Sequence, residues 1–113
     1  MNEVTNGALQ SFIIDNDGKL SNAFSTVNSG GSSPAFAAAL STGEVAVFNY
    51  GSGNGKVVPT ASGNPLKLNR SAPLISLPQP AAPSVSHPHE AVEHNGELFV
   101  PDLVSSFDRN SVQ

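Results

Sequence analysis

The apolar residues of this chain fall into short runs that are separated by polar turns. Residues 9–14 (LQSFII) lead to a turn at residues 16–18 (NDG), and residues 20–27 can return from it as the second strand of a hairpin. Residues 44–50 are apolar at consecutive positions near their start, which is typical of a strand that is buried on both faces. We therefore predict an all-β chain without a long helix, with antiparallel strands near residues 9–14, 20–27, 35–40, 44–50, 56–60, 66–69, 90–94 and 97–101.

Glycine and proline mark the segments between the predicted strands. Residues 51–55 (GSGNG) are too rich in glycine for a regular strand and are predicted to form a turn. A P-loop is not expected there, because no Lys-Ser/Thr pair and no helix follow. Residues 74–77 are a further short strand candidate, and the proline-rich residues 78–83 are expected to run over the surface.

An internal repeat relates two parts of the sequence. Residues 34–52 (PAFAAALSTGEVAVFNYGS) and residues 88–105 (PHEAVEHNGELFVPDLVS) both run from a proline to a Gly-Glu pair and then into a short apolar strand. We therefore predict that residues 35–40 pair with 44–50 and that residues 90–94 pair with 97–101. The repeat also places residues 49, 50, 101 and 102 at matching strand ends, which we expect to be exposed. Self-similarity on this scale indicates a β-propeller blade.

A second, shorter repeat links Asp17-Gly18-Lys19-Leu20 to Asn54-Gly55-Lys56-Val57. Each of these segments comes shortly after an apolar strand. We therefore expect the two segments to occupy equivalent positions.

Composition and charge narrow the possible partners. The 113 residues suffice for one small domain, and 12% charged residues with 10 Gly and 9 Pro indicate short strands joined by many turns. A formal net charge of −4 with only five Lys and Arg argues against nucleic-acid or membrane-surface binding. No apolar run is long enough to span a membrane. The absence of cysteine excludes disulfides, and the absence of a signal peptide favours a cytoplasmic protein. Residues 69–71 (NRS) match the N-glycosylation pattern, which we interpret as chance in a protein without a signal peptide.

Three histidines lie within eight residues, at His87, His89 and His94. His87 and His89 would point to one face of an extended chain, and Glu93 follows four residues after His89. This spacing is the one by which cupin-type barrels bind a divalent metal, although a further histidine would be needed. The alternative is that these residues are polar side chains at the start of a strand. We expect no cofactor and no tightly bound metal.

Asp102 is a second candidate for chemistry, because His89, Asp102 and one of the many serines could form a Ser-His-Asp triad. The Gly-x-Ser-x-Gly motif that would support such a triad is missing. Asp102 follows Pro101 at a strand end, so an Asx-turn is favoured over a catalytic carboxylate.

Two of these segments resemble one family of enzymes. SGGSSPAFAAALSTGEVAVFNYGSGNGKVVP is similar to a blade of the lactonase-family seven-bladed β-propellers, and SHPHEAVEHNGELFVPDL is similar to the following blade. The resemblance covers roughly residues 9–104. The family includes 6-phosphogluconolactonases and carboxy-cis,cis-muconate cyclases, and the sequences of the two motifs most resemble those of fungal members.

The resemblance implies a metal-independent enzyme that opens or closes a lactone ring. His89 corresponds to a candidate acid–base residue of the cyclase branch, with His87 beside it. The Arg and Glu that accompany it in the family come from later blades, and neither Arg109 nor Glu90 occupies their positions. Phe36 stands where many members carry a histidine.

The resemblance also implies a partial propeller, because a seven-bladed ring needs roughly three hundred residues or more. About two blades are expected, with a first unit at residues 9–77, a connector at 78–86, a second unit at 87–104 and a frayed tail at 105–113. The expected function is that of a lactonase or cycloisomerase fragment, inactive in isolation, that acts on a small-molecule lactone or muconate-type carboxylate. The alternatives are a non-catalytic interaction module, which would bind missing blades or a second copy of itself through open edges, and a cupin-like metal-binding domain.

Overall fold

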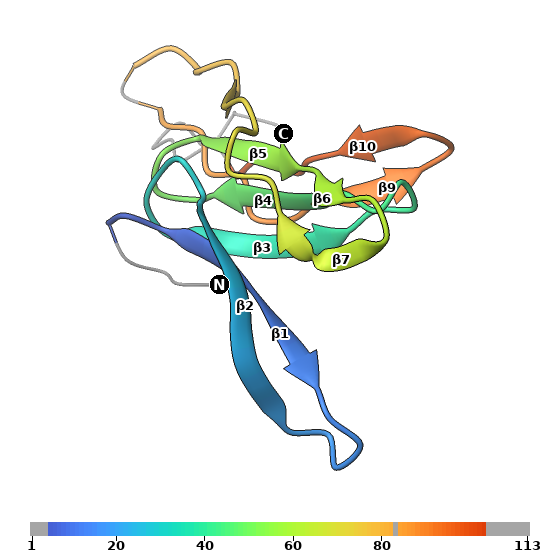
Figure 1. Cartoon of the computed structure of the whole chain (residues 1–113). Coiled ribbons are helices and arrows are strands. Elements are labelled where there is room, and N and C mark those ends of the chain that lie inside the picture. The colour runs from blue at the N-terminus through green and yellow to red at the C-terminus, as the bar shows by residue number, and fades with distance from the viewer. Residues whose placement is uncertain (1–4, 83, 104–113) are drawn as a thin grey trace.

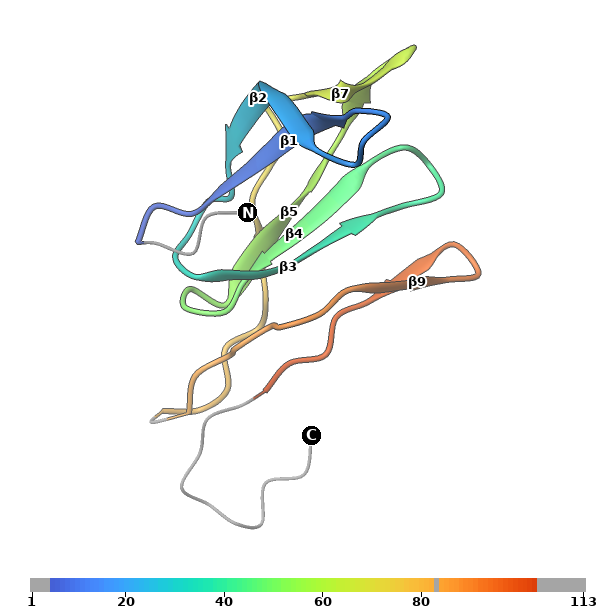
Figure 2. The same cartoon turned by 90° about the horizontal axis from the view of Figure 1, so that it is seen from below.

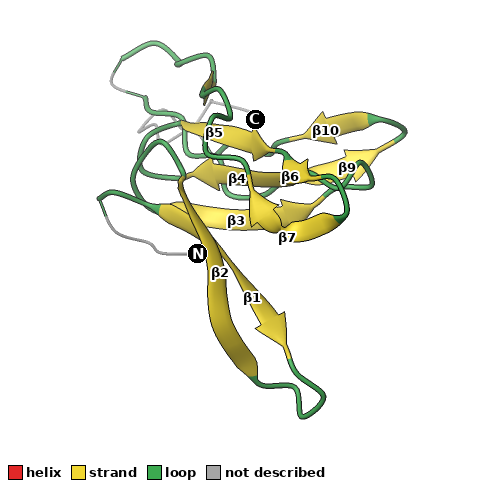
Figure 3. Cartoon of the chain, viewed as in Figure 1, coloured by secondary structure: helices red, strands yellow, loops and turns green. Residues whose placement is uncertain are grey.

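The computed structural model describes residues 5–82 and 84–103, with only the strand path given for residues 22–24. Within these ranges the chain forms β-strands and no helix (Figures 1 and 3), which confirms the all-β prediction. The strands are β1 (Ala8–Ile14), β2 (Leu20–Asn28), β3 (Pro34–Ala39), β4 (Val45–Asn49), β5 (Asn54–Val58), β6 (Thr60–Ala61), β7 (Asn64–Leu68), β8 (Ile75–Ser76), β9 (Val92–His94) and β10 (Glu97–Phe99). None of the described residues forms a helix that could cross a membrane.

The first two strands form the predicted hairpin. β1 and β2 pair antiparallel, and Leu9 lies opposite Val27. The Asp15 carboxylate closes the turn, since its Oδ1 atom accepts hydrogen bonds from the backbone amides of Asp17 at 3.0 Å and Lys19 at 2.9 Å. Gly18 adopts a φ of 78°, a conformation that favours glycine.

A four-stranded antiparallel sheet forms the centre of the structure, in the order β3-β4-β5-β8. The pairing of β3 with β4 confirms the prediction for residues 35–40 and 44–50. β5 pairs with β4 over its whole length, and its other edge pairs with β8. β8 corresponds to the strand candidate at residues 74–77.

Gly55 departs from two of the predictions. It lies inside β5, opposite Phe48, so the turn predicted for residues 51–55 ends one residue before Asn54. A Cβ atom at Gly55 would overlap the ring of Phe48 and the carbonyl oxygen of Val47, and this close cross-strand contact explains why a glycine stands in a strand. Gly18 lies instead at an exposed turn, so the expected equivalence of residues 17–20 with 54–57 is wrong.

Two further hairpins complete the described chain. β6 pairs with β7, and β9 pairs with β10, which confirms the second pairing predicted from the repeat. The turn of the second hairpin, Asn95-Gly96, has φ values of 50° and 77°, as a tight two-residue turn requires. Both strands are shorter than predicted, because regular pairing extends only from Val92 to His94 and from Glu97 to Phe99.

β4 is the most buried strand, and two apolar clusters cover its two faces. On one face, Val47 packs with Leu9 and Val27 of the β1–β2 hairpin. On the other face, Ala46 and Phe48 pack with residues of the β9–β10 segment; the members of this second cluster outside β4 are Phe36, Ala38, Leu40, Val57, Leu77, Ala91, Leu98 and Val100. The prediction that this strand is buried on both sides is confirmed. Figure 2 shows the resulting three layers, with the central sheet between the two hairpins.

The proline-rich connector runs over the surface as expected, because most of its described residues are exposed. The predicted frayed tail, residues 105–113, lies outside the described residues.

Candidate functional site

Several loops meet at one end of the central sheet, which we call the loop end. It consists of residues 28–33 after β2, residues 49–54 after β4, the segment 86–89 and Asp102. The first two are joined by backbone hydrogen bonds from Tyr50 to Ser33 at 2.9 Å and from Gly51 to Ser32 at 3.1 Å. The Ser52 hydroxyl adds a bond from the backbone amide of Ser32 at 2.8 Å. The loop end is therefore held together by polar contacts between segments that are distant in sequence.

The internal repeat recurs at the loop end as a pair of matching bridges. Pro34 lies opposite Asn49 in the pairing of β3 with β4, and Pro88 forms an isolated bridge with Asp102. Asn49 and Asp102 are therefore structural equivalents at two successive strand ends. This geometry confirms the repeat that relates residues 34–52 to residues 88–105.

Asn49 is fully buried, so the expectation that it is exposed is wrong. Its Nδ2 atom donates to the carbonyl oxygen of Ser29 at 2.9 Å and to Oδ1 of Asn54 at 2.8 Å. These bonds join the loops before β3 and before β5, which explains the burial of an amide at a strand end. Among the described residues, its Oδ1 atom accepts no hydrogen bond.

Asp102 joins the last strand end to the histidine segment. Its Oδ2 atom accepts a hydrogen bond from the hydroxyl of the buried Ser86 at 2.6 Å, and its Oδ1 atom accepts one from the backbone amide of His87 at 2.6 Å. Both partners are distant in sequence, since they precede Asp102 by 16 and 15 residues. The partner of the favoured Asx-turn would be the backbone amide of residue 104, which lies outside the described residues. In place of a triad contact to His89, Asp102 fixes the backbone at His87.

His87 is half-buried and lies against Tyr50. The two rings are stacked, with centroids 4.3 Å apart and an angle of 15° between their planes. The Nδ1 atom of His87 lies 2.7 Å from the carbonyl oxygen of Tyr50. A carbonyl oxygen can only accept, so this contact places the hydrogen of the neutral imidazole on Nδ1 and leaves the lone pair on Nε2.

His89 is exposed and has a similar arrangement. Its backbone amide donates to the carbonyl oxygen of Pro101 at 3.3 Å, and its Nδ1 atom lies 3.3 Å from the carbonyl oxygen of His87. The lone pair of a neutral His89 therefore also lies on Nε2, which makes no hydrogen bond with the described residues. A solvent-accessible imidazole with a free Nε2 can accept a proton from a substrate or from water.

The structure does not bring together the residues of the cupin-like metal alternative. Glu93 lies at the opposite end of the sheet from His87, where its carboxylate accepts bonds from the amide of Ser41 at 2.8 Å and the hydroxyl of Ser41 at 2.7 Å. Both bonds lower the pKa of Glu93 below its ordinary value of 4.5. Within the described ranges no three His, Asp or Glu side chains gather as a metal site. His94 lies apart from His87 and His89, and its Nε2 atom is 3.1 Å from the side-chain amide of Asn95.

Ser86 and Tyr50 contribute to the site in ways that the sequence did not indicate. No sequence pattern singles out Ser86, although it stands directly before the His-Pro-His segment. The repeat indicates Tyr50 only as a strand-end residue, and its stacking on His87 joins positions that are 37 residues apart. Phe36 packs against the apolar cluster around Phe48.

Comparison with protein families gives one match that covers most of the chain. The model described as "Lactonase, 7-bladed beta-propeller" matches residues 1–105. No curated protein gives a significant match, and neither does any solved structure.

Proposed function

Because the chain belongs to the lactonase family of seven-bladed β-propellers, we propose that it contributes part of the site of an enzyme that opens or closes a lactone ring. His89 is the proposed general acid–base residue. The observation that carries this proposal is the exposed imidazole of His89, with Nδ1 directed at a backbone carbonyl and Nε2 free. His87 and Asp102 position it, since Asp102 and Tyr50 fix the segment that precedes His89.

The proposed hydrolysis needs one group that first takes and then returns a proton. Nε2 of His89 accepts a proton from a water molecule while the water oxygen forms a bond to the lactone carbonyl carbon. The ring C–O bond then breaks, and the imidazolium gives its proton to the departing ring oxygen. The products are a hydroxyl group and a carboxylic acid, so atoms and protons balance.

A muconate-type carboxylate would undergo the related ring closure. One carboxylate oxygen adds to a carbon of the C=C bond, and the neighbouring carbon receives a proton from the imidazolium of His89. The same residue serves both substrate classes, because an imidazole can donate and accept protons near neutral pH. Both proposed substrates belong to the class of small lactones and carboxylates that the family resemblance implies.

We further propose that the 113-residue chain is inactive alone. The resemblance places the accompanying Arg and Glu in later blades, and the lost stabilisation of developing carboxylate charge would be large. The described strands form one four-stranded sheet and separate two-stranded hairpins, which do not close into a seven-bladed ring.

A chimera tests this proposal. Residues 9–103 replace the matching strands of an active lactonase-family propeller, and lactone hydrolysis is measured at saturating substrate. We expect His89→Gln to lower the rate by about 10²- to 10⁴-fold, the range for a lost acid–base group. His94→Gln is the matched control, since His94 lies at the far turn, and it should leave the rate unchanged. Full activity of the His89→Gln chimera, or turnover by the unmodified 113-residue chain, would contradict the proposal.

A non-catalytic binding module is the second candidate function. Val92 and Phe99 lie opposite each other on the β9–β10 hairpin and are 45% and 52% exposed. Leu98 and Val100, which alternate with Phe99, contribute to the apolar cluster on the central sheet. The outer face of this hairpin is thus an apolar surface that further strands or a second copy of the chain could cover.

A further inference from the structure

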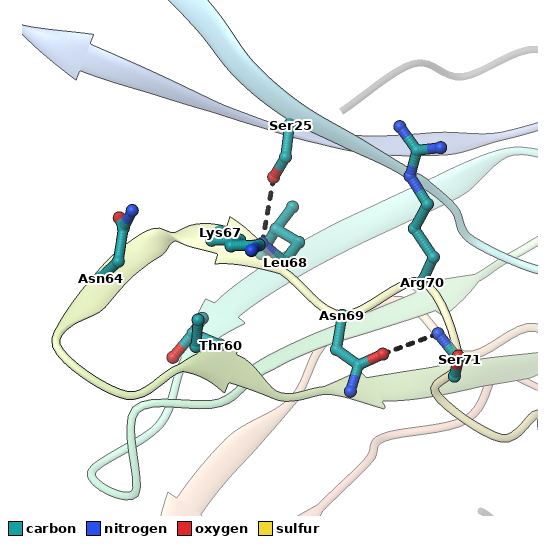
Figure 4. A pocket seen from close by; sticks show the side chains of 9 residues that line it. Ser25, Thr60, Asn64, Lys67, Leu68, Asn69, Arg70 and Ser71 are labelled. Atoms are coloured by element: carbon teal, nitrogen blue, oxygen red, sulfur yellow. Dashed lines mark hydrogen bonds between the residues drawn. The ribbon is translucent and has the colours of Figure 1, made fainter.

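A cavity of about 690 Å³ lies beside the β6–β7 hairpin. Its walls come from Ser25 on β2, from β6 and β7, and from residues 69–71 after β7 (Figure 4). None of its lining residues belongs to the loop end. Its volume is in the range of sites that bind small molecules.

The cavity is positively charged, although the chain as a whole is acidic. Lys67 and Arg70 line it, and no Asp or Glu does. In the described part of the chain, neither cation has a carboxylate within the 4.0 Å of an ion pair. The cavity therefore holds two of the five basic side chains of a protein whose net charge is −4.

The two asparagines of the cavity are oriented as donors. Oδ1 of Asn64 accepts the backbone amide of Leu66 at 3.2 Å, and Oδ1 of Asn69 accepts the backbone amide of Ser71 at 2.8 Å. The oxygen of each side chain is therefore used by the backbone. Each Nδ2 group makes no hydrogen bond to the described residues and remains available to a ligand.

We propose that this cavity binds a small organic phosphate. Lys67 and Arg70, which form no ion pair with the described carboxylates, match the charge of a phosphate monoester better than that of a monocarboxylate. The Nδ2 groups of Asn64 and Asn69 and the Ser71 hydroxyl supply donors for further oxygen atoms. Inorganic phosphate would fill only a small part of 690 Å³, which leaves room for an organic group beside the phosphate. This site is independent of the proposed lactone chemistry, because it shares no residue with the loop end.

The test uses the 113-residue chain and follows its backbone amide signals by NMR. Ribose 5-phosphate should produce saturable shifts at residues 64–71, inorganic phosphate should bind more weakly, and ribose should produce no shift. Lys67→Gln and Arg70→Gln should each weaken binding of ribose 5-phosphate about tenfold, as expected for a lost charge-assisted hydrogen bond. Lys19→Gln removes the same charge at the β1–β2 turn, outside the cavity, and should leave the affinity unchanged.

Asn69→Asp gives a second, more conservative variant. The carboxylate can still accept the amide of Ser71, so the local turn is kept while a donor is replaced by a negative charge. We expect a dispersed amide spectrum and no saturable binding. The proposal would be overturned by an absence of saturable shifts in the unmodified chain, by equal weakening in Lys19→Gln, or by inorganic phosphate binding as tightly as ribose 5-phosphate.

Discussion

Asn49 and Asp102 occupy equivalent strand ends and hold their neighbouring loops with opposite chemistry. The amide of Asn49 donates to the carbonyl oxygen of the buried Ser29, whereas the carboxylate of Asp102 accepts from the hydroxyl of the buried Ser86. In both cases a side chain at a strand end is hydrogen-bonded to the segment that precedes the proline opposite it, Pro34 or Pro88. Asn49 carries an amide because Ser29 presents a carbonyl oxygen, which needs a donor. Asp102 carries a carboxylate because Ser86 and His87 present donors, which need an acceptor.

Asp102→Ala should destabilise the chain by about 2 kcal/mol, because it leaves the buried Ser86 hydroxyl and the His87 amide without an acceptor. Urea unfolding followed by circular dichroism measures the change. The double variant Ser86→Ala, Asp102→Ala should lose less than the sum of the two single variants, since they share one hydrogen bond. Additive losses would show that the bond does not contribute.

Glu93→Gln should alter how stability depends on pH. The two bonds from Ser41 lower the pKa of Glu93 in the folded chain. Its carboxylate therefore stabilises the fold above its ordinary pKa of 4.5, and this contribution is lost as the pH falls through the lowered folded pKa.

We expect the unmodified chain to be more stable than Glu93→Gln at pH 7, and the difference to shrink toward pH 3. Urea midpoints at several pH values provide the measurement. Glu97→Gln, on the neighbouring strand, is the control, because the side chain of Glu97 makes no hydrogen bond to the described residues. A difference between the unmodified chain and Glu93→Gln that stays constant with pH would contradict the assignment.

The sequence identifies candidate residues of the loop end, but it does not predict which residues they contact. His87, His89 and Asp102 stand in a short motif, so composition and spacing are enough to select them. Their partners are set by which loops the strands bring to one end, and Tyr50 reaches His87 only through that arrangement. The local pattern at Asp102 favours an Asx-turn and does not indicate the long-range bonds to Ser86 and His87.

At the scale of elements, the hydrophobic pattern identifies the strands whose surroundings are regular. β4 shows apolar residues on both faces and is buried on both. β9 and β10 are shorter than expected because the pattern marks apolar positions and says little about where pairing stops. The glycine-rich composition of residues 51–55 predicts a turn that includes Gly55, whereas the Phe48 ring on the adjacent strand requires a residue without a side chain there.

Gly55→Ala should destabilise the central sheet by about 3 kcal/mol, since the added methyl group overlaps the backbone and ring of β4. Gly63→Ala is the matched control. Gly63 has a φ of 73° but open space around it, so alanine there should cost only about 1 kcal/mol of backbone strain. Thermal unfolding of both variants gives the comparison, and equal losses would argue against the cross-strand overlap.

At the scale of the whole molecule, the described chain is a stack of three layers with β4 at its centre. The two apolar clusters are separated by the central sheet, and each outer hairpin is covered on one side only. Residues with exposed apolar side chains lie on both hairpins, including Ile14 at 71% and Phe99 at 52% exposure. The order of the layers could not be read from the repeat, because the repeat identifies hairpins and not the faces on which they pack.

The exposed face of β9–β10 should make the 113-residue chain self-associate. Burial of a Phe side chain contributes about 1.5–3 kcal/mol, so Phe99→Lys should weaken association by about tenfold or more. Sedimentation velocity over a range of concentrations measures this effect. Leu74→Lys, at an exposed apolar residue outside both hairpins, is the control. A monomer at all concentrations, or equal effects of the two variants, would contradict this prediction.

The matching bridges Pro34–Asn49 and Pro88–Asp102 also bear on how such a gene can change in length. Each bridge begins a new layer, and the two prolines are about 54 residues apart. A duplication or deletion of one such period would begin and end at matching positions of the repeat. The chain would then pass from one layer to another as it does at Pro34 and Pro88. An insertion or deletion of most other lengths would shift the strands of one layer relative to the residues on which they pack. Insertions and deletions that evolution retains in this chain should therefore either span a whole period or fall within the long connector at residues 78–86.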